Sequence, residues 1–185
     1  MLSAGWIVLG LCWLAWAWPF VFRAPHYQKR PSITAIAPTW AGLLLEVLAI
    51  ALALAFRLPP GHPPAPARIL ASMAAGLIAP ALSWTSVKRL GRQFRLNAGL
   101  YEDHELVRTG PYGIVRHPIY SSLLAMLLST ILLMTPWPWA AVSLLLFVVG
   151  TEIRVRTEDN LLASRFGRKF AEYRKKVSAY VPFVR

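Results

Sequence analysis

The amino-acid sequence alternates between long apolar runs and shorter polar segments. The apolar runs, each with at most one charged residue, are Leu2–Phe22, Pro38–Phe56, Ile69–Val87, Tyr120–Met134 and Trp137–Ile153. The first run holds 21 residues and the second 19, which is enough for a helix to cross a hydrocarbon core of ~30 Å. The last two runs hold 15 and 17 residues. This pattern predicts an all-α integral membrane protein with five transmembrane helices.

The connections between the runs predict how the helices are joined. Residues 59–66 are rich in proline and predict a short extended connector. Thr135 and Pro136 separate the last two runs, where proline stops one helix and starts the next. Because both of these runs are short, we expect a tight C-terminal helical hairpin that tilts or locally thins the bilayer. Trp137 and Trp139 suit its membrane interface.

A different periodicity follows the last run. From Arg154 onward, apolar residues recur at roughly helical spacing with basic residues between them. The apolar set is Leu161, Leu162, Phe166, Phe170, Tyr173 and Val177. We expect an amphipathic C-terminal helix that lies on an anionic membrane face. The chain is interpreted as one membrane domain, residues 1–185, with three N-terminal spans in residues 1–87 and the hairpin region in residues 88–185.

The distribution of basic residues predicts an orientation in the membrane. With five spans and the N-terminus outside, 18 of the 20 Lys and Arg residues fall on the cytoplasmic side. Lys and Arg are favoured in cytoplasmic connections, so this arrangement is the expected one. The two large polar segments, residues 88–118 and 154–185, then face the cytoplasm together. A site shared between them is sterically possible.

Composition agrees with a lipid environment. Hydrophobic residues make up 56% of the chain and charged residues 15%, against ~25% charged residues in soluble domains. The mean hydropathy is +0.47. The net charge of +12 would attract phosphate, but the basic residues lie in short stretches between apolar runs. We therefore expect membrane lipid as a partner and no nucleic acid.

Several common sites are excluded by the absence of their motifs. The sequence has no G-x-G-x-x-G, no P-loop and no G-x-S-x-G. Cys12 is the single cysteine, which excludes an intrachain disulfide and a cysteine metal site. The four histidines lack metal-ligand spacing. We predict no metal site.

Polar residues gather at two places where the chain enters or leaves the predicted hairpin. Arg116 and His117 stand at the start of its first helix, where free N–H groups and cationic side chains can bind an anion. The alternative is a basic flank that only sets topology. At the end of the second helix, Arg154 and Glu158 are four residues apart and could pair on one helical face. The alternative is an ordinary surface pair.

Glu46 is a charged residue inside a predicted span. A buried acidic side chain in a membrane is costly and is a functional candidate by default. It could line the entry of a lipid substrate, or it could hydrogen-bond a neighbouring helix while protonated. The sequence favours the structural role.

The second half of the chain resembles the isoprenylcysteine carboxyl methyltransferase family. His104 to Tyr120 matches the pattern H-E-L-V-x-x-G-x-Y-x-x-x-R-H-P-x-Y. Glu158 to Tyr173 matches E-x-x-x-L-x-x-x-F-G-x-x-[FY]-x-x-Y. The resemblance extends from Asn97 to the C-terminus. The wider superfamily also contains phospholipid N-methyltransferases and, more distantly, membrane sterol reductases.

The resemblance implies an integral membrane methyltransferase with a cytoplasmic pocket for S-adenosylmethionine above the hairpin. It places Arg154 at the substrate carboxylate and Arg116 near the reaction. By motif position, the residues of the cofactor pocket would be Asn97, His104, Glu105, Leu106, Val107, Tyr112, His117, Pro118, Ile119, Tyr120 and Glu158. Asn97 matches by spacing only.

The residue types fit this chemistry. A carboxylate is ionised at neutral pH and needs no general base, and one arginine can hold it through its bidentate fork. An amine acceptor would have to lose a proton, which would make Glu158 or Glu105 a base. Arg154 and Arg116 favour a lipophilic carboxylate of prenylcysteine type. A phospholipid N-methyltransferase, a membrane reductase that uses NADPH and a lipid-binding scaffold are the alternatives, and the acceptor and the oligomeric state stay open.

Overall fold

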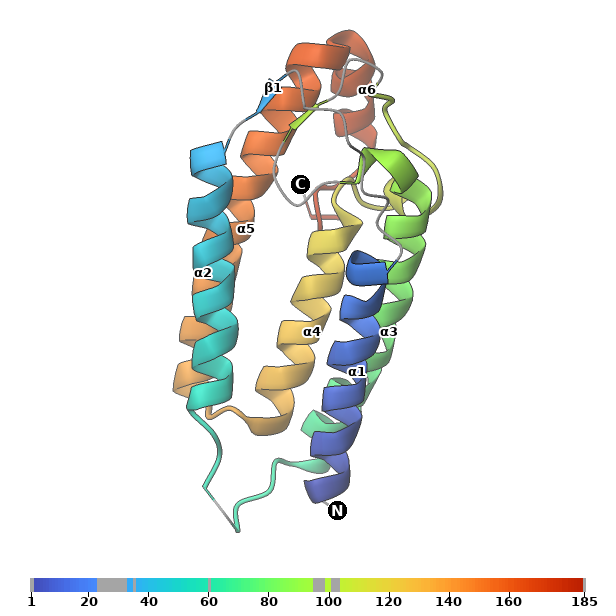
Figure 1. The fold of residues 1–185 in the computed structure, drawn as a ribbon. Coiled ribbons are helices and arrows are strands. Elements are labelled where there is room, and N and C mark those ends of the chain that lie inside the picture. Colours follow the sequence, from blue (N-terminus) through green and yellow to red (C-terminus); the bar gives the residue numbers. More distant parts are fainter. Residues whose placement is uncertain are drawn as a thin grey trace.

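The structure is a computed structural model that describes residues 2–22, 33–34, 36–59, 61–94, 99–100 and 104–184. Five long helices form the body of the molecule (Figure 1). They are α1 (Leu2–Phe22), α2 (Ile36–Ala55), α3 (Pro66–Leu90), α4 (Pro118–Met134) and α5 (Trp137–Phe166). The bounds of α1, α2 and α4 agree closely with the predicted apolar runs, whereas α3 extends beyond its run at both ends and α5 continues well past Ile153.

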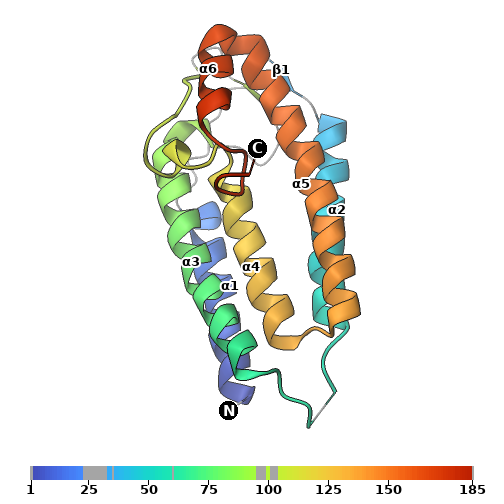
Figure 2. The ribbon, with the colours of Figure 1, turned by 180° about the vertical axis from the view of Figure 1, so that it is seen from behind.

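The helices run alternately up and down and form two groups (Figures 1 and 2). The most extensive helix contacts join α2 to α5 and α3 to α4, and α1 packs on α3. The two helices of the expected hairpin are consecutive, but they make few contacts with each other. Thr135 and Pro136 join α4 to α5, and each of these two helices packs mainly against an earlier helix.

Among the described residues, four helices are long and apolar enough to cross a membrane: α1, α2, α3 and α5. α4 is an apolar helix of 17 residues and is shorter than the others. Large apolar side chains such as Leu14, Leu44 and Leu145 are exposed on the helices. Together these features define an all-α membrane protein.

The C-terminal region differs from the predicted single amphipathic helix. α5 continues past the apolar run to Phe166, and Gly167 (φ +49°) ends it in the left-handed region that favours glycine. A short helix, α6 (Arg168–Lys176), then turns back. Phe170 and Tyr173 of α6 are buried in the protein, so this apolar face packs on the molecule and is not available to the membrane surface.

Short elements connect the helices at the end of the molecule that carries α6. β1 (Ile33–Thr34) pairs antiparallel with β2 (Gly99–Leu100), which places the α1–α2 and α3–α4 connections side by side. Two 3-10 turns, η1 (Gly91–Gln93) and η2 (Gly110–Gly113), follow α3 and precede α4. At the opposite end, residues 59 and 61–65 form no helix, as the proline-rich segment predicted.

Small and polar residues set the closest helix contacts. Ser72 donates a hydrogen bond to the Ser129 carbonyl (2.7 Å) and joins α3 to α4. At the α2–α5 crossing, a Cβ on Gly150 would lie 2.6 Å from the Gly42 carbonyl oxygen. Only glycine therefore allows α2 and α5 to approach this closely. This crossing places α2 beside the polar end of α5.

Candidate functional site

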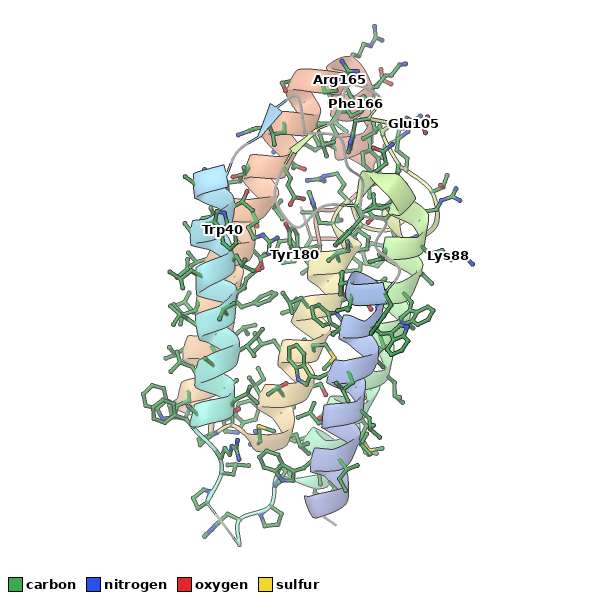
Figure 3. The ribbon with its side chains drawn as sticks, viewed as in Figure 1. Trp40, Lys88, Glu105, Arg165, Phe166 and Tyr180 are labelled. Atoms are coloured by element: carbon green, nitrogen blue, oxygen red, sulfur yellow. The ribbon has the colours of Figure 1, made fainter. Side chains whose placement is uncertain are left out.

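A cavity of about 480 Å³ lies between the two helix groups at the α6 end of the molecule. In Figure 3, Trp40 on α2 and Glu105 near α6 lie on opposite sides of this region, and both line the cavity. Its wall combines aromatic and aliphatic side chains with a small set of charged ones. Cavities of this size and character are typical of small-molecule sites.

The cavity brings together most of the residues singled out in the sequence. Those that line it are His104, Glu105, Leu106, Val107, Tyr112, Arg116, His117, Ile119, Tyr120, Arg154 and Glu158. Pro118 begins α4 and is buried, but it is not part of the wall. Asn97 lies outside the described residues. The segment from residue 104 and the ends of two consecutive helices thus form one surface.

His117 stands at the N-cap of α4 between two carboxylates of α5. Its Nδ1 lies 3.2 Å from Oε2 of Glu158, and its Nε2 lies 2.9 Å from Oδ1 of Asp159. Burial opposes protonation, but the hydrogen bonds and charges of these carboxylates outweigh it and raise the pKa of His117 above its usual value. A ring with an acceptor at each nitrogen is doubly protonated. We therefore interpret His117 as a cation that fixes both carboxylates.

Glu158 has both carboxylate oxygens engaged. Oε2 accepts from His117, and Oε1 accepts a short hydrogen bond from the Tyr120 hydroxyl. The guanidinium of Arg154 lies over the Tyr120 ring, with its Cζ 4.7 Å from the ring centroid. This is a cation–π arrangement. Three wall residues from α4 and α5 are therefore fixed relative to one another.

Arg154 does not form the expected ion pair with Glu158. Its Nη1 lies 2.6 Å from Oε2 of Glu46 on α2, and Thr151 donates to the other oxygen of Glu46 at 2.9 Å. The Glu46 side chain is 1% exposed and the Arg154 side chain 9%. Glu46 thus links α2 to α5, as the structural alternative predicted. It does so in an ion pair with Arg154 and not as the protonated acid that was expected.

Arg116 is held inside the protein. Its Nη2 lies 2.9 Å from Oδ2 of Asp159, with side chains 1% and 2% exposed. Its Nη1 donates a short hydrogen bond to the carbonyl of Val177. The backbone N–H groups of Arg116 and His117 donate to the carbonyls of Ser178 and Ala179, both at 2.8 Å. Arg116 therefore fastens the C-terminal segment to the start of α4.

The turn before α4 places Tyr112 in the wall. The Tyr173 hydroxyl of α6 donates a short hydrogen bond to the Tyr112 carbonyl, and burial raises the pKa of Tyr173 to about 12. The Tyr112 hydroxyl is buried and has no hydrogen-bond partner among the described residues. Burial also raises the pKa of Tyr112 well above its usual value, so this hydroxyl is a neutral donor toward the cavity.

The first two helices contribute wall residues that no motif in the sequence indicated. Trp16 and Phe20 of α1 and Trp40 and Leu43 of α2 line the cavity. The role of Asp159, which pairs with both Arg116 and His117, was not predicted either. In α2, the acidic Glu46 was the one sequence feature that pointed to a contribution to the site, because a charged residue inside a membrane span is rare. The apolar wall residues have no such signal.

The helices and the cavity define an α-helical membrane protein with a largely apolar cavity, which carries a few charged side chains, at one end of its bundle. Within the described residues, no group of three or more His, Cys, Asp and Glu side chains has the arrangement of a metal site. A model of the isoprenylcysteine carboxyl methyltransferase (ICMT) family matches residues 72–164, half of the chain. The chain belongs to this family.

Individual relatives agree with the family assignment. Protein-S-isoprenylcysteine O-methyltransferase B of Arabidopsis thaliana is 34% identical over 103 residues, which cover 54% of this chain and 52% of the relative. Protein-S-isoprenylcysteine O-methyltransferase of Schizosaccharomyces pombe is 37% identical over 87 residues, 45% of this chain and 35% of the relative. The cobalt-zinc-cadmium resistance protein CzcN of Cupriavidus metallidurans is 36% identical over 92 residues, 48% of this chain and 42% of the relative. The chain spans about half or less of the length of these relatives.

Proposed function

We propose that this protein is an integral membrane methyltransferase that uses S-adenosylmethionine to O-methylate the carboxylate of a lipophilic, prenylcysteine-like acceptor. The observation that carries the proposal is the cavity wall. Its residues from the segment before α4 and from the facing ends of α4 and α5 are those of the family motifs. The names of the relatives support the same reaction and acceptor class.

The wall has the features that a methyl-donor pocket needs. The buried Tyr112 hydroxyl has no partner among the described residues, so it leaves a donor for a bound ligand. Trp16 and Phe20 add aromatic surface, and Glu158 adds negative charge. The residues proposed to hold S-adenosylmethionine are His104, Glu105, Leu106, Val107, Tyr112, His117, Ile119, Tyr120 and Glu158, with Asn97 and Pro118 as further motif positions.

Bound S-adenosylmethionine supplies a methyl group on a cationic sulfonium, which a carboxylate can accept without a general base. Arg154 is the residue we place at the acceptor carboxylate, because it lines the cavity beside Tyr120. Trp40, Leu43 and Leu123 give the wall an apolar side for a lipophilic tail. Arg116 is paired with Asp159, so its proposed part in the reaction is to position the start of α4.

The pairing of Glu158 favours a carboxylate acceptor over an amine. An amine must lose a proton before it attacks, which requires a base with a free oxygen. Both oxygens of Glu158 already accept hydrogen bonds from His117 and Tyr120. The N-methyltransferase alternative would therefore require either that the Glu158 network break or that Glu105, which also lines the cavity, act as the base.

We also propose that α4 is the fifth span and that the cavity faces the cytoplasm. α4 lies beside α3 along its length, so its 17 residues share the depth of a longer helix (Figure 2). Most basic residues then fall on the cytoplasmic side, as the positive-inside rule requires. A Cys12→Ser background allows single cysteines to be placed at His62 and at Glu105. A membrane-impermeant thiol reagent should label position 62 from outside and position 105 only in opened cells.

Ligand binding to the purified full-length protein tests the proposed function. Calorimetry should detect S-adenosylmethionine and S-adenosylhomocysteine at micromolar concentrations, and NADPH should not bind. Methyl transfer should occur to N-acetyl-S-farnesylcysteine and not to phosphatidylethanolamine. Binding of NADPH alone would indicate a reductase, and transfer to the amine would overturn the acceptor class.

A further inference from the structure

Glu46 lies against the proposed acceptor residue, although it belongs to a helix that the family model does not match. The match covers residues 72–164, whereas Glu46 lies in α2. Its carboxylate holds Nη1 of Arg154 at 2.6 Å and accepts from Thr151 at 2.9 Å. A carboxylate that is 1% exposed in a membrane helix is costly unless its partner is fixed.

Two residues of α2, one helical turn apart, shape the position of Arg154. Glu46 takes its guanidinium, and Gly42 makes room for its stem, since a Cβ on Gly42 would lie 2.5 Å from Cγ of Arg154. The guanidinium also lies over the Tyr120 ring, with Cζ 4.7 Å from the ring centroid. The Arg154 side chain is thus held by Gly42 at its aliphatic stem, by Tyr120 at one face of the guanidinium and by Glu46 at one edge. A ligand that binds Arg154 therefore loses little free energy to ordering this side chain.

The pairing also sets the charge that an acceptor meets. A carboxylate acceptor approaches Arg154 together with Glu46, a pair with no net charge. Methylation turns the carboxylate into a neutral ester, so a strong cation stabilises the anionic ground state more than the transition state, in which part of that charge has been lost. Because the buried carboxylate of Glu46 offsets the charge of Arg154, this cost is avoided, and Arg154 can still orient the carboxylate of the acceptor.

We propose that Glu46 is a positioning residue that orients Arg154 and weakens its hold on the acceptor carboxylate. The proposal rests on the proposed function, because it assigns Arg154 to the acceptor. It predicts a particular signature for Glu46→Gln. Glutamine preserves the shape: its carbonyl oxygen can accept from Arg154 and its amide N–H can donate to the Thr151 hydroxyl. It leaves the charge of Arg154 without its offset.

The test compares two probes, N-acetyl-S-farnesylcysteine and its methyl ester, by calorimetry on the purified full-length protein. The wild type should bind the carboxylate modestly better than the ester. In Glu46→Gln this preference should rise roughly tenfold, with little change for the ester, and the kcat and the KM for the acceptor should both fall roughly tenfold. Arg154→Gln should abolish the preference.

Glu172→Gln is the matched control, because Glu172 also pairs with an arginine, Arg168, but on the exposed surface of α6. It should behave as the wild type. An unchanged preference in Glu46→Gln would overturn the proposal, as would a raised KM, which indicates a merely structural role. If the wild type binds neither probe nor the methyl donor, the proposed function itself has failed, which is a different result.

A second variant keeps the test decisive if Glu46→Gln does not fold. The double variant Glu46→Gln/Arg154→Gln has no unbalanced buried charge and should fold as a neutral pair. It should bind the carboxylate and the ester equally. A retained preference for the carboxylate would show that another residue recognises it and would overturn the proposal.

Discussion

Nε2 of His117 lies 2.9 Å from Oδ1 of Asp159, and both side chains are buried. The second ring nitrogen faces Glu158, so the imidazolium joins the start of α4 to two consecutive carboxylates of α5. These helices make few contacts with each other. Their relative placement at the cavity therefore depends on this charged bridge more than on apolar packing.

Stability should fall as the pH rises through the pKa of His117. Folding raises that pKa above the ordinary value of 6.5. The stabilisation is complete below the unfolded pKa, where the imidazolium forms in both states, and it is lost as the pH passes the higher folded value. The melting temperature of the purified protein should thus decline from mildly acidic pH upward.

His117→Gln should flatten this dependence, and His62→Gln, a change in the exposed connector, should leave it as in the wild type. The melting temperature of each variant, followed from pH 5 to pH 9, provides the measurement. If the melting temperature falls with pH equally steeply in the wild type and in His117→Gln, His117 does not carry the stabilising positive charge.

Loss of the Glu158 charge should weaken binding of the methyl donor. Glu158→Gln removes the anion that His117 and Tyr120 hold in the wall. Hydrogen bonds to charged groups contribute about 1.5–3 kcal/mol, so the Kd for S-adenosylhomocysteine should rise tenfold or more by calorimetry. Arg154→Gln should change that Kd less than about twofold, since its assigned partner is the acceptor. If Arg154→Gln alone abolishes binding of S-adenosylhomocysteine, the assignment of Glu158 to the methyl donor and of Arg154 to the acceptor is contradicted.

Arg116 should contribute to stability far more than Arg174, although both pair with Asp159. Arg116 is buried at 2.9 Å, whereas Nε of Arg174 lies 3.8 Å away on a side chain that is 48% exposed. Removing one partner of a buried ion pair costs about 3–5 kcal/mol, and an exposed pair contributes about 0–1 kcal/mol. Arg116→Gln should lower the melting temperature strongly, and Arg174→Gln should lower it little. Similar losses in both variants would contradict the assignment of the buried bridge to Arg116.

The α2–α5 crossing should not tolerate a methyl group. A Cβ on Gly42 would lie 2.5 Å from Cγ of Arg154 and 2.7 Å from the Gly150 carbonyl oxygen, and overpacking costs about 1–3 kcal/mol. Gly10→Ala is the control, because nothing lies within 4 Å of its added Cβ. Thermal unfolding should show a lower melting temperature for Gly42→Ala and an equal or higher one for Gly10→Ala.

Much of the fold could be predicted from local sequence patterns. The run Leu2–Phe22 coincides with α1, and Tyr120–Met134 lies within α4. Long apolar runs favour helices in lipid whatever their partners are, because the backbone must satisfy its own hydrogen bonds there. The packing partners were not predicted: α4 and α5 pack mainly against earlier helices, and the apolar face of α6 packs on the molecule. Such contacts depend on the tertiary structure.

The candidate site divides in the same way. The motif residues around His117 and Glu158 were predicted together because they lie at adjoining helix ends, and the structure places them in one cavity wall. Arg154 has Glu158 one turn away on its own helix, yet the structure pairs it with Glu46. The partner of a buried charge depends on which backbones approach closely, and here that is decided by two glycines on different helices.

The sequence by itself therefore determined the helical membrane fold, the family and the motif residues of the pocket, because periodicity and motif spacing are local properties of the chain. The tertiary structure decided that α2 completes the wall, that Asp159 holds Arg116 and His117, and that Glu46 holds Arg154. These relationships join residues up to 108 positions apart in the chain. They arise from helix packing and from the need to pair every buried charge.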